Sequence, residues 1–180
     1  MNNSKQYPFK IVLTGPESSG KTTLAKYLAH SRKVVWVQEF ARCYLAGLGR
    51  PYKRTDLQYI GRGQYAWEQW VVAQKPPQLI CDTDWTVLHV WEHYRFGLPD
   101  GEGWEWEKGY LKRQPANLYL LCAPDFPWQP DPLREHPAER QIIFKWYERL
   151  LQETAAPYAV LQGSFEQRIK TAISLIRRNC

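Results

Sequence analysis

The sequence lacks three features that would place it among secreted, membrane-bound or zinc-binding proteins. No apolar run approaches the roughly 18 residues of a membrane span, and the first ten residues, MNNSKQYPFK, contain no apolar signal core. The cysteines are far apart and form no CxxC pair, so neither a disulfide framework nor a zinc knuckle is expected: Cys43, Cys81, Cys122 and Cys180. We therefore expect a cytoplasmic protein with no membrane partner.

What the chain does contain fits one folded domain. Its 180 residues are close to the usual size of a single domain, and we expect residues 1–180 to form one. A hydrophobic content of 44% with 23% charged residues is ordinary for a globular protein, which excludes intrinsic disorder. Nine Trp and eleven Tyr are more rings than a core of this size needs, so some should line a surface or a pocket.

The charge pattern points to an anionic partner. The chain has 24 basic and 18 acidic residues, a formal net charge of +6. Nine basic and two acidic residues fall between Lys21 and Arg62, whereas seven acidic and one basic residue fall between Asp82 and Glu107. One region should attract phosphate, and the other could hold a cation.

Short apolar runs alternate with stretches of helical period, which is typical of a parallel sheet covered by helices on both faces. The expected strands are Phe9–Thr14, Val34–Gln38, Gln78–Cys81, Leu118–Cys122 and Tyr158–Leu161. The expected helices are Lys21–His30, Ala41–Leu48, Asp56–Gln74, Trp85–Tyr94, Trp104–Lys112, Ala138–Glu153 and Phe165–Arg177, the last with an N-cap at Ser164. The segments Gly47–Thr55 and Ala123–Pro137, the second with five prolines, interrupt this alternation and are expected to be loops over one site.

The strongest motif is GPESSGKT at residues 15–22, which matches GxxxxGK[ST] directly after a strand and before a helix. Glycines at both ends allow the backbone N–H groups to turn toward phosphates, and the helix N-terminus adds positive potential. Lys21 should reach the β- and γ-phosphates, and Thr22 should offer an oxygen to Mg²⁺. The expected ATP-binding set is Gly15, Pro16, Glu17, Ser18, Ser19, Gly20, Lys21, Thr22, Thr23 and Arg140.

Carboxylates follow two further strands. Asp82 ends the run QLICD, where a magnesium-binding carboxylate is expected, and Asp84 follows two residues later. Either aspartate could instead cap the helix that begins at Trp85. Glu39 and Arg42, in EFARCY, should lie at the same edge of the sheet, where Glu39 could position or deprotonate an attacking hydroxyl. A surface ion pair between Glu39 and Arg42 is the alternative.

Two arginines lie in or beside the proline-rich segment, in PWQPDPLREHPAER. Cationic side chains on a closing lid can neutralise the charge that spreads over a phosphoryl group during transfer. Arg134 is the stronger candidate, since Arg140 could lie on the solvated face of the next helix.

The segment His89-Val-Trp-Glu92-His93 matches HxxEH, a zinc-protease signature. No third ligand stands out in the sequence, so we interpret both histidines as ordinary helix residues beside Trp85 and Trp91.

Taken in order, GPESSGKTTL, EFARCY, ICDTDW and PWQPDPLREHPAER resemble the ribosylnicotinamide kinase domain of NadR-type proteins, from about Phe9 to Leu161. The resemblance implies a five-stranded P-loop NTPase fold of three α/β/α layers, with a lid at about residues 123–137. It implies phosphorylation of the 5′-hydroxyl of nicotinamide riboside with ATP and Mg²⁺. It also implies that Asp82 serves the metal, that Glu39 and Asp84 hold the ribose hydroxyls, and that Arg134 contacts the transferred phosphate. With Lys21, these residues form the expected catalytic set.

The sequence departs from this family near the base of the acceptor. Gln38 stands where the family often has an aromatic residue. Another ring could stack on the base in its place, and the candidates are Trp85, Tyr65, Trp67 and Trp128. Each of these rings could equally be an ordinary packing residue. The expected acceptor-binding residues are therefore Glu39, Arg42, Asp84 and Trp85.

Other functions fit the same residues. The chain could phosphorylate another nucleoside, or the 5′ end of a nucleic acid held by Arg50, Lys53, Arg54 and Arg62. It could also be a nucleotide-dependent ATPase or switch whose output is a contact with a partner. The lid arginines and the supply of aromatic residues favour an enzyme with a second substrate pocket.

Overall fold

The computed structural model describes residues 7–97 and 116–179. The strands are β1 (Phe9–Thr14), β2 (Val35–Val37), β3 (Gln78–Asp82), β4 (Leu118–Cys122) and β5 (Tyr158–Leu161). The helices are α1 (Lys21–Arg32), α2 (Phe40–Ala46), α3 (Arg54–Ala73), α4 (Trp85–Phe96), α6 (Arg140–Glu153) and α7 (Phe165–Asn179). The helix expected at Trp104–Lys112 lies outside the described residues.

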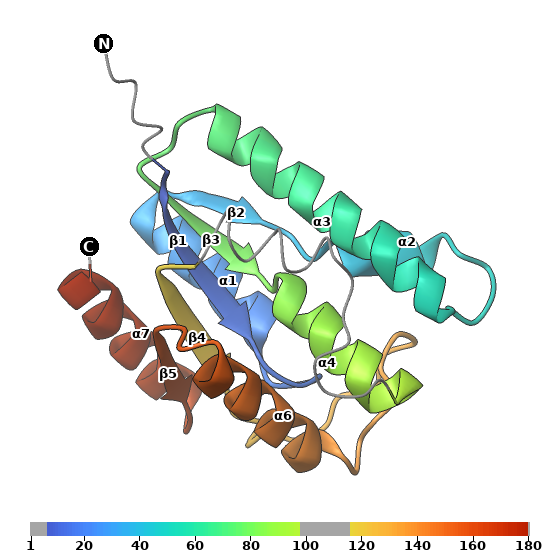
Figure 1. Ribbon diagram of the computed structural model, residues 1–180. Coiled ribbons are helices and arrows are strands. Elements are labelled where there is room, and N and C mark those ends of the chain that lie inside the picture. Colours follow the sequence, from blue (N-terminus) through green and yellow to red (C-terminus); the bar gives the residue numbers. More distant parts are fainter. Residues whose placement is uncertain (1–6, 98–115, 180) are drawn as a thin grey trace.

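All five strands are parallel and form one sheet in the order β2-β3-β1-β4-β5. Helices α1 and α7 cover one face, and α3, α4 and α6 cover the other (Figure 1). The chain therefore has the parallel sheet covered on both faces that the alternation of strands and helices predicted, in the three-layer α/β/α arrangement of P-loop NTPases that the resemblance implied. The central strands β1, β3 and β4 are buried on both faces, which explains why their sequences are mostly continuous apolar runs.

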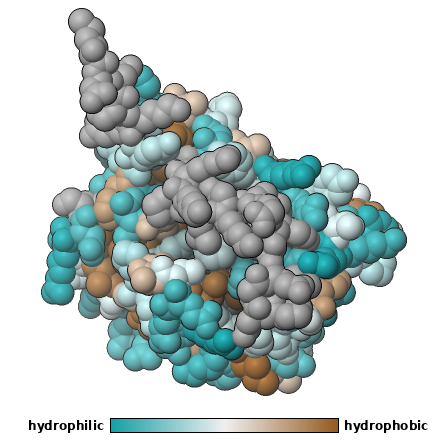
Figure 2. All heavy atoms as spheres, viewed as in Figure 1, coloured by the Kyte–Doolittle hydropathy of each residue, from teal (hydrophilic) through white to brown (hydrophobic). Residues whose placement is uncertain are grey.

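The apolar core is split by the sheet into two clusters. Val12, Leu79 and Leu121 point toward the layer of α3, α4 and α6, whereas Ile11 and Leu13 point toward α1 and α7. On the molecular face in Figure 2, hydrophilic side chains cover much of the described surface. None of the helices in residues 7–97 and 116–179 is long and apolar enough to cross a membrane.

Most element boundaries agree with the sequence prediction to within about two residues. Strand β2 is shorter than expected because Lys33 adopts a left-handed C-cap and the Val34 N–H bonds the Ala29 carbonyl of α1. Ser164 does cap α7, since its hydroxyl accepts from the Gln167 N–H at 3.3 Å.

The register between β1 and β3 brings the glycine-rich loop close to Asp82. Leu13, near the end of β1, pairs with Asp82 at the end of β3. The loop that follows β1 and the carboxylate that ends β3 therefore lie side by side at the carboxyl edge of the sheet.

Candidate active site

The loop between β1 and α1 is held in a shape that only small residues allow. Gly15 has φ 129°, and a β-carbon there would lie 2.6 Å from the Cys122 carbonyl oxygen. Gly20 has φ 81°, and a β-carbon there would lie 3.0 Å from the Phe126 ring. Any other residue would be strained at either position, so these glycines allow the phosphate-binding turn.

Two side chains, one in this loop and one at the first position of α1, form hydrogen bonds to the loop backbone. The Ser19 hydroxyl and the Lys21 ammonium both donate to the Pro16 carbonyl, at 2.8 and 2.7 Å. Lys21 thus folds back over the loop, and it lines the cavity described below.

Asp82 has the surroundings of a metal-binding carboxylate. It is 1% exposed, and its Oδ1 atom has no hydrogen-bond partner among the described residues. Burial raises the pKa of this carboxyl, while the hydrogen bond from Thr22 and the charge of Lys21 lower it. A buried, unpartnered carboxylate oxygen next to a threonine hydroxyl is a costly arrangement unless a cation completes it. The residues present therefore fit Mg²⁺, with Thr22 and Asp82 as its protein ligands.

Glu39 and Arg42 lie at the start of α2 and connect it to the proline-rich segment. Arg42 Nε lies 3.4 Å from Glu39 Oε2, and Arg42 Nη1 donates to Asp131 Oδ2 at 3.1 Å. Burial raises the pKa of Glu39, and the nearby charge of Asp82 raises it further. The pair expected from the sequence is present, but it is part of a chain of three charges that reaches the segment after β4.

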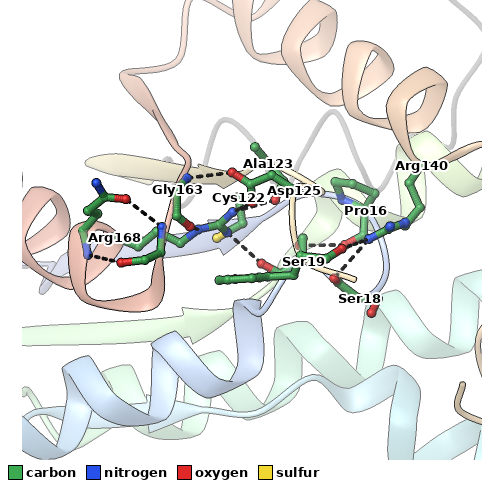
Figure 3. Close-up of polar contacts among 12 residues, drawn as sticks. Pro16, Ser18, Ser19, Cys122, Ala123, Asp125, Arg140, Gly163 and Arg168 are labelled. Atoms are coloured by element: carbon green, nitrogen blue, oxygen red, sulfur yellow. Dashed lines mark hydrogen bonds and ion pairs between the residues drawn. The ribbon is translucent and has the colours of Figure 1, made fainter. Parts of the chain in front are cut away.

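The proline-rich segment, residues 123–137, packs directly on the loop between β1 and α1, residues 15–20, which we call the phosphate loop. Arg140, at the first position of α6, donates to the carbonyls of Phe126 at 2.9 Å and Ser18 at 3.4 Å (Figure 3). Its guanidinium also lies 5.7 Å from the Trp128 ring centroid. The alternative of a solvated Arg140 is therefore wrong, because the side chain is half-buried against this loop.

A second residue of the phosphate loop, Glu17, also contacts the proline-rich segment. The Glu17 carboxylate accepts hydrogen bonds from the backbone N–H groups of Glu135 and His136, at 3.0 and 3.3 Å. Arg134 donates to the Gln129 carbonyl and lines the cavity described next.

A cavity of about 390 Å³ joins several of these groups to an apolar region, although Asp82 and Arg140 are not among its lining residues. At one end it is lined by the phosphate loop and the first residues of α1, from Gly15 to Thr23, and Glu39, Arg42 and Arg134 lie along it. The other end is formed by apolar and aromatic side chains from α2, α3, α4, α6 and the connection between α2 and α3, namely Leu45, Tyr52, Leu57, Ile60, Val87, Leu88, Trp91 and Tyr147. The space can hold a polyanion at one end and a flat organic group at the other.

Asp84 and Trp85, expected to bind the acceptor, do not line this cavity. Asp84 is 1% exposed and caps α4, accepting from the Thr86 N–H at 3.0 Å and from the Tyr119 hydroxyl at 2.8 Å. Trp85 is buried and donates to the Tyr119 hydroxyl at 3.1 Å. The physical reason is Thr83, whose φ of 70° breaks the extended path, so that Asp84 turns into the core instead of following Asp82.

The aromatic lining also differs from the expected rings. Trp67 packs edge-on against Phe40, with centroids 4.9 Å apart, and does not line the cavity. Tyr65 and Trp128 are also absent from its lining. The rings at the apolar end are those of Tyr52, Trp91 and Tyr147. No motif in the sequence singles them out, because they come from three separate parts of the chain.

The HxxEH segment has structural partners. His93 Nδ1 lies 2.9 Å from the His89 carbonyl oxygen, and Glu92 accepts from Arg54 Nε at 2.8 Å. Across the described part of the chain, no group of three or more His, Cys, Asp or Glu side chains could hold a metal ion. These contacts agree with interpreting the histidines as ordinary helix residues.

The basic cluster considered for nucleic acid is partly neutralised. Arg50 donates to Asp56 at 2.8 Å, and Arg54 is paired with Glu92. Two of the four basic residues are thus held in ion pairs within the protein.

Comparisons with known proteins agree with this geometry. A family model described as AAA domain matches residues 10–168. Two solved structures of NadR protein, one in complex with NAD and AMP-PNP and one with NR, align with 22% identity each and TM-scores of 0.76 and 0.80. They cover 97% of this chain, which spans only about half of theirs, 50% and 52%.

Two structures of kinases share the fold at lower identity. Thymidylate kinase from Ehrlichia chaffeensis aligns over 96% of this chain and 100% of its own, with 12% identity and a TM-score of 0.68. Deoxyadenosine kinase from M. mycoides aligns over 94% of this chain and 99% of its own, with 12% identity and a TM-score of 0.65. Comparison with curated proteins gives no match. The fold is thus that of a P-loop kinase, similar to NadR and to nucleoside and nucleotide kinases.

Proposed function

We propose that this chain, which belongs to the AAA domain family, is a kinase that uses ATP and Mg²⁺ to phosphorylate the 5′-hydroxyl of a riboside. One observation carries the proposal: a single cavity is lined both by the phosphate loop and by a set of apolar and aromatic side chains, and Glu39 lines the same cavity. An ATPase or switch needs the first end of that cavity but has no use for the second.

The preferred acceptor is nicotinamide riboside, which would give nicotinamide mononucleotide. Three observations support this choice. The motifs resemble those of ribosylnicotinamide kinases, and one NadR neighbour is described in complex with NR. Tyr52 and Trp91 could stack on a flat base at the apolar end of the cavity.

In the proposed reaction, the 5′-oxygen of the acceptor forms a bond to the γ-phosphorus as the bond to the β-phosphate oxygen breaks and ADP leaves. Glu39 accepts the hydroxyl proton, and Arg42 holds the Glu39 carboxylate in place. Lys21 and Arg134 neutralise charge on the transferred group. Mg²⁺, held by Thr22 and Asp82, would add further neutralisation of the phosphates.

The domain assignment is part of the same proposal. Residues 1–180 would act as one kinase domain, with the segment at about residues 123–137 as the lid. Its contacts with Glu17, Ser18 and Arg42 connect it to the phosphate loop and to the start of α2. Closure would exclude water from the transferred phosphoryl group.

The test is product analysis by mass spectrometry after incubation with Mg²⁺, ATP and separate nucleosides, including nicotinamide riboside and deoxynucleosides. A 5′-hydroxyl oligonucleotide is a further arm, and the Lys21→Ala protein controls for contaminating kinases. A phosphorylated riboside that is absent from the control supports the proposal. Phosphorylation of the oligonucleotide alone, or ADP formation with no phosphorylated acceptor, would contradict it.

A further inference from the structure

A charged side chain is buried beside the phosphate loop in a place that no motif marks. Arg168, in the first turn of α7, is 1% exposed and is the largest of the fully buried side chains. Burying a guanidinium is unfavourable unless its N–H groups and its charge find partners. Its partners therefore indicate what the residue does.

Arg168 contacts three segments that are far apart in the sequence (Figure 3). Its Nη1 donates to the Ser19 carbonyl of the phosphate loop at 2.8 Å. Its Nη2 donates to the Ala123 carbonyl after β4 at 2.9 Å and is paired with Asp125. Its Nε donates to the Gly163 carbonyl after β5 at 3.1 Å. The planar fork of an arginine allows these bonds to form together, and a lysine has no equivalent geometry.

The same guanidinium also fixes one wall of the cavity. It lies 4.2 Å from the centroid of the Phe126 ring, and that ring is packed against Gly20. Phe126 lines the cavity, whereas Arg168 does not. Arg168 therefore acts on this wall through other residues.

The contact with Ser19 has a direct consequence for phosphate binding. A trans peptide is planar, so its C=O and the following N–H point in opposite directions, and the described chain contains no cis peptide. Because Arg168 holds the Ser19 carbonyl toward α7, the Gly20 N–H is turned away from α7. Gly20 lines the phosphate end of the cavity.

We propose that Arg168 is a positioning residue for the ATP site, which orients the Gly20 N–H toward the phosphates and holds Phe126 in the cavity wall. The inference rests on the proposed function, since it assumes that the phosphate loop binds ATP. Substitution of Arg168 should change the affinity for the nucleotide and not that for the acceptor, because none of the Arg168 contacts reaches the apolar end of the cavity. A residue that only stabilised the fold would alter the melting temperature and leave nucleotide affinity unchanged.

The experiment measures the dissociation constant of MgADP by titration calorimetry, below the melting temperature of each protein. Arg168→Ala should raise this constant about ten- to hundredfold, as expected for the loss of one charge-assisted hydrogen bond that orients the loop. Addition of guanidinium ion at non-denaturing concentration should restore part of the affinity. Arg168→Lys keeps the charge and should fold, but it should recover affinity only in part because it lacks the fork.

Ile173→Ala is the matched control, because Ile173 is on the same helix and packs against the core without touching the phosphate loop. It should lower the melting temperature and leave the MgADP constant unchanged. Equal affinity in the wild-type and both Arg168 variants would overturn the inference, as would an Ile173→Ala protein that loses affinity as much as Arg168→Ala does. Wild-type protein that binds MgADP but phosphorylates no riboside would reject the proposed function instead, and the Arg168 comparison would still be decided by the binding constants.

Discussion

The ring of Phe40 lies directly on the backbone of Gly63, so close that a β-carbon at position 63 would come within 2.2 Å of it. The neighbouring Gln64 accepts the Phe40 N–H at 2.8 Å. Helix α3 therefore fixes the first residue of α2, and with it the position of Glu39. The proposed base is thus held by a helix that carries none of the phosphate-binding groups.

Gly63→Ala should destabilise the protein and lower kcat. At an ordinary helix position this substitution adds up to about 1 kcal/mol of stability, so a lower melting temperature would be diagnostic of the contact with Phe40. Thermal melts and initial rates test both effects. Adding Phe40→Leu to Gly63→Ala should recover stability, and a simple sum of the two losses would contradict this account.

Lys21→Ala should leave a folded protein with phosphoryl transfer reduced by orders of magnitude. The Lys21 ammonium donates to the Pro16 carbonyl of the preceding loop, and Lys21 is not part of either apolar cluster, so its loss removes little from the core. Its charge is needed where negative charge develops during transfer. Circular dichroism checks that the variant is folded, and a coupled assay for ADP measures its turnover. Unchanged turnover would contradict the role assigned to Lys21.

Asp82→Asn should raise the Mg²⁺ concentration needed for half-maximal activity, because an amide oxygen carries no formal charge for a hard cation. Asp84→Asn is the matched control, since that carboxylate caps α4 outside the cavity. It should lower the melting temperature while leaving the Mg²⁺ dependence close to that of the wild-type. A Mg²⁺ titration of all three proteins decides the assignment, and equal shifts in both variants would reject it.

The pH dependence of kcat should show an acid limb above the ordinary range of a glutamate. Burial and the charge of Asp82 raise the pKa of Glu39, so as the pH falls this carboxylate gains a proton earlier than usual and can no longer accept one. Glu39→Gln should lower kcat and abolish that limb. It should also raise the melting temperature at pH 7, because the charged form is the one that burial penalises. An unchanged limb would assign it to another group.

Arg134→Ala should lower kcat more than it raises the KM for ATP. Arg134 lines the cavity, and its side chain donates to the Gln129 carbonyl of its own segment. A contact made mainly in the transition state has this kinetic signature. Lys145→Ala, an exposed cation on α6 outside the cavity, should leave both constants unchanged. A change confined to KM would place Arg134 in ground-state binding.

The sequence predicted the sheet and the phosphate end of the site because their signals are local. A buried strand, a glycine-rich turn and a helix follow one another within Phe9–Arg32, and each is encoded by its own residues. The neighbouring position of Asp82 followed from strand alternation alone. The structure has both features where the sequence predicted them.

The apolar end of the cavity and the role of Asp84 could not be predicted in this way. Tyr52 lies in the connection between α2 and α3 and Trp91 lies on α4, so the two line one cavity only in the folded chain. The turn at Thr83 depends on a positive φ in a non-glycine residue, which no residue pattern announces. Arg168 is similar, since its partners Ser19 and Ala123 are distant in sequence and offer only backbone carbonyls.

The two ends of the cavity are built by different parts of the molecule. The phosphate end comes from loops after the central strands, whereas the apolar end comes mainly from helices on one face of the sheet. Substitutions among Leu57, Ile60 and Trp91 could therefore change which acceptor is used without disturbing the transfer chemistry. For protein engineering, this division of the cavity separates substrate preference from turnover. Libraries directed at these helices can explore new acceptors while the residues of the phosphate end stay unchanged.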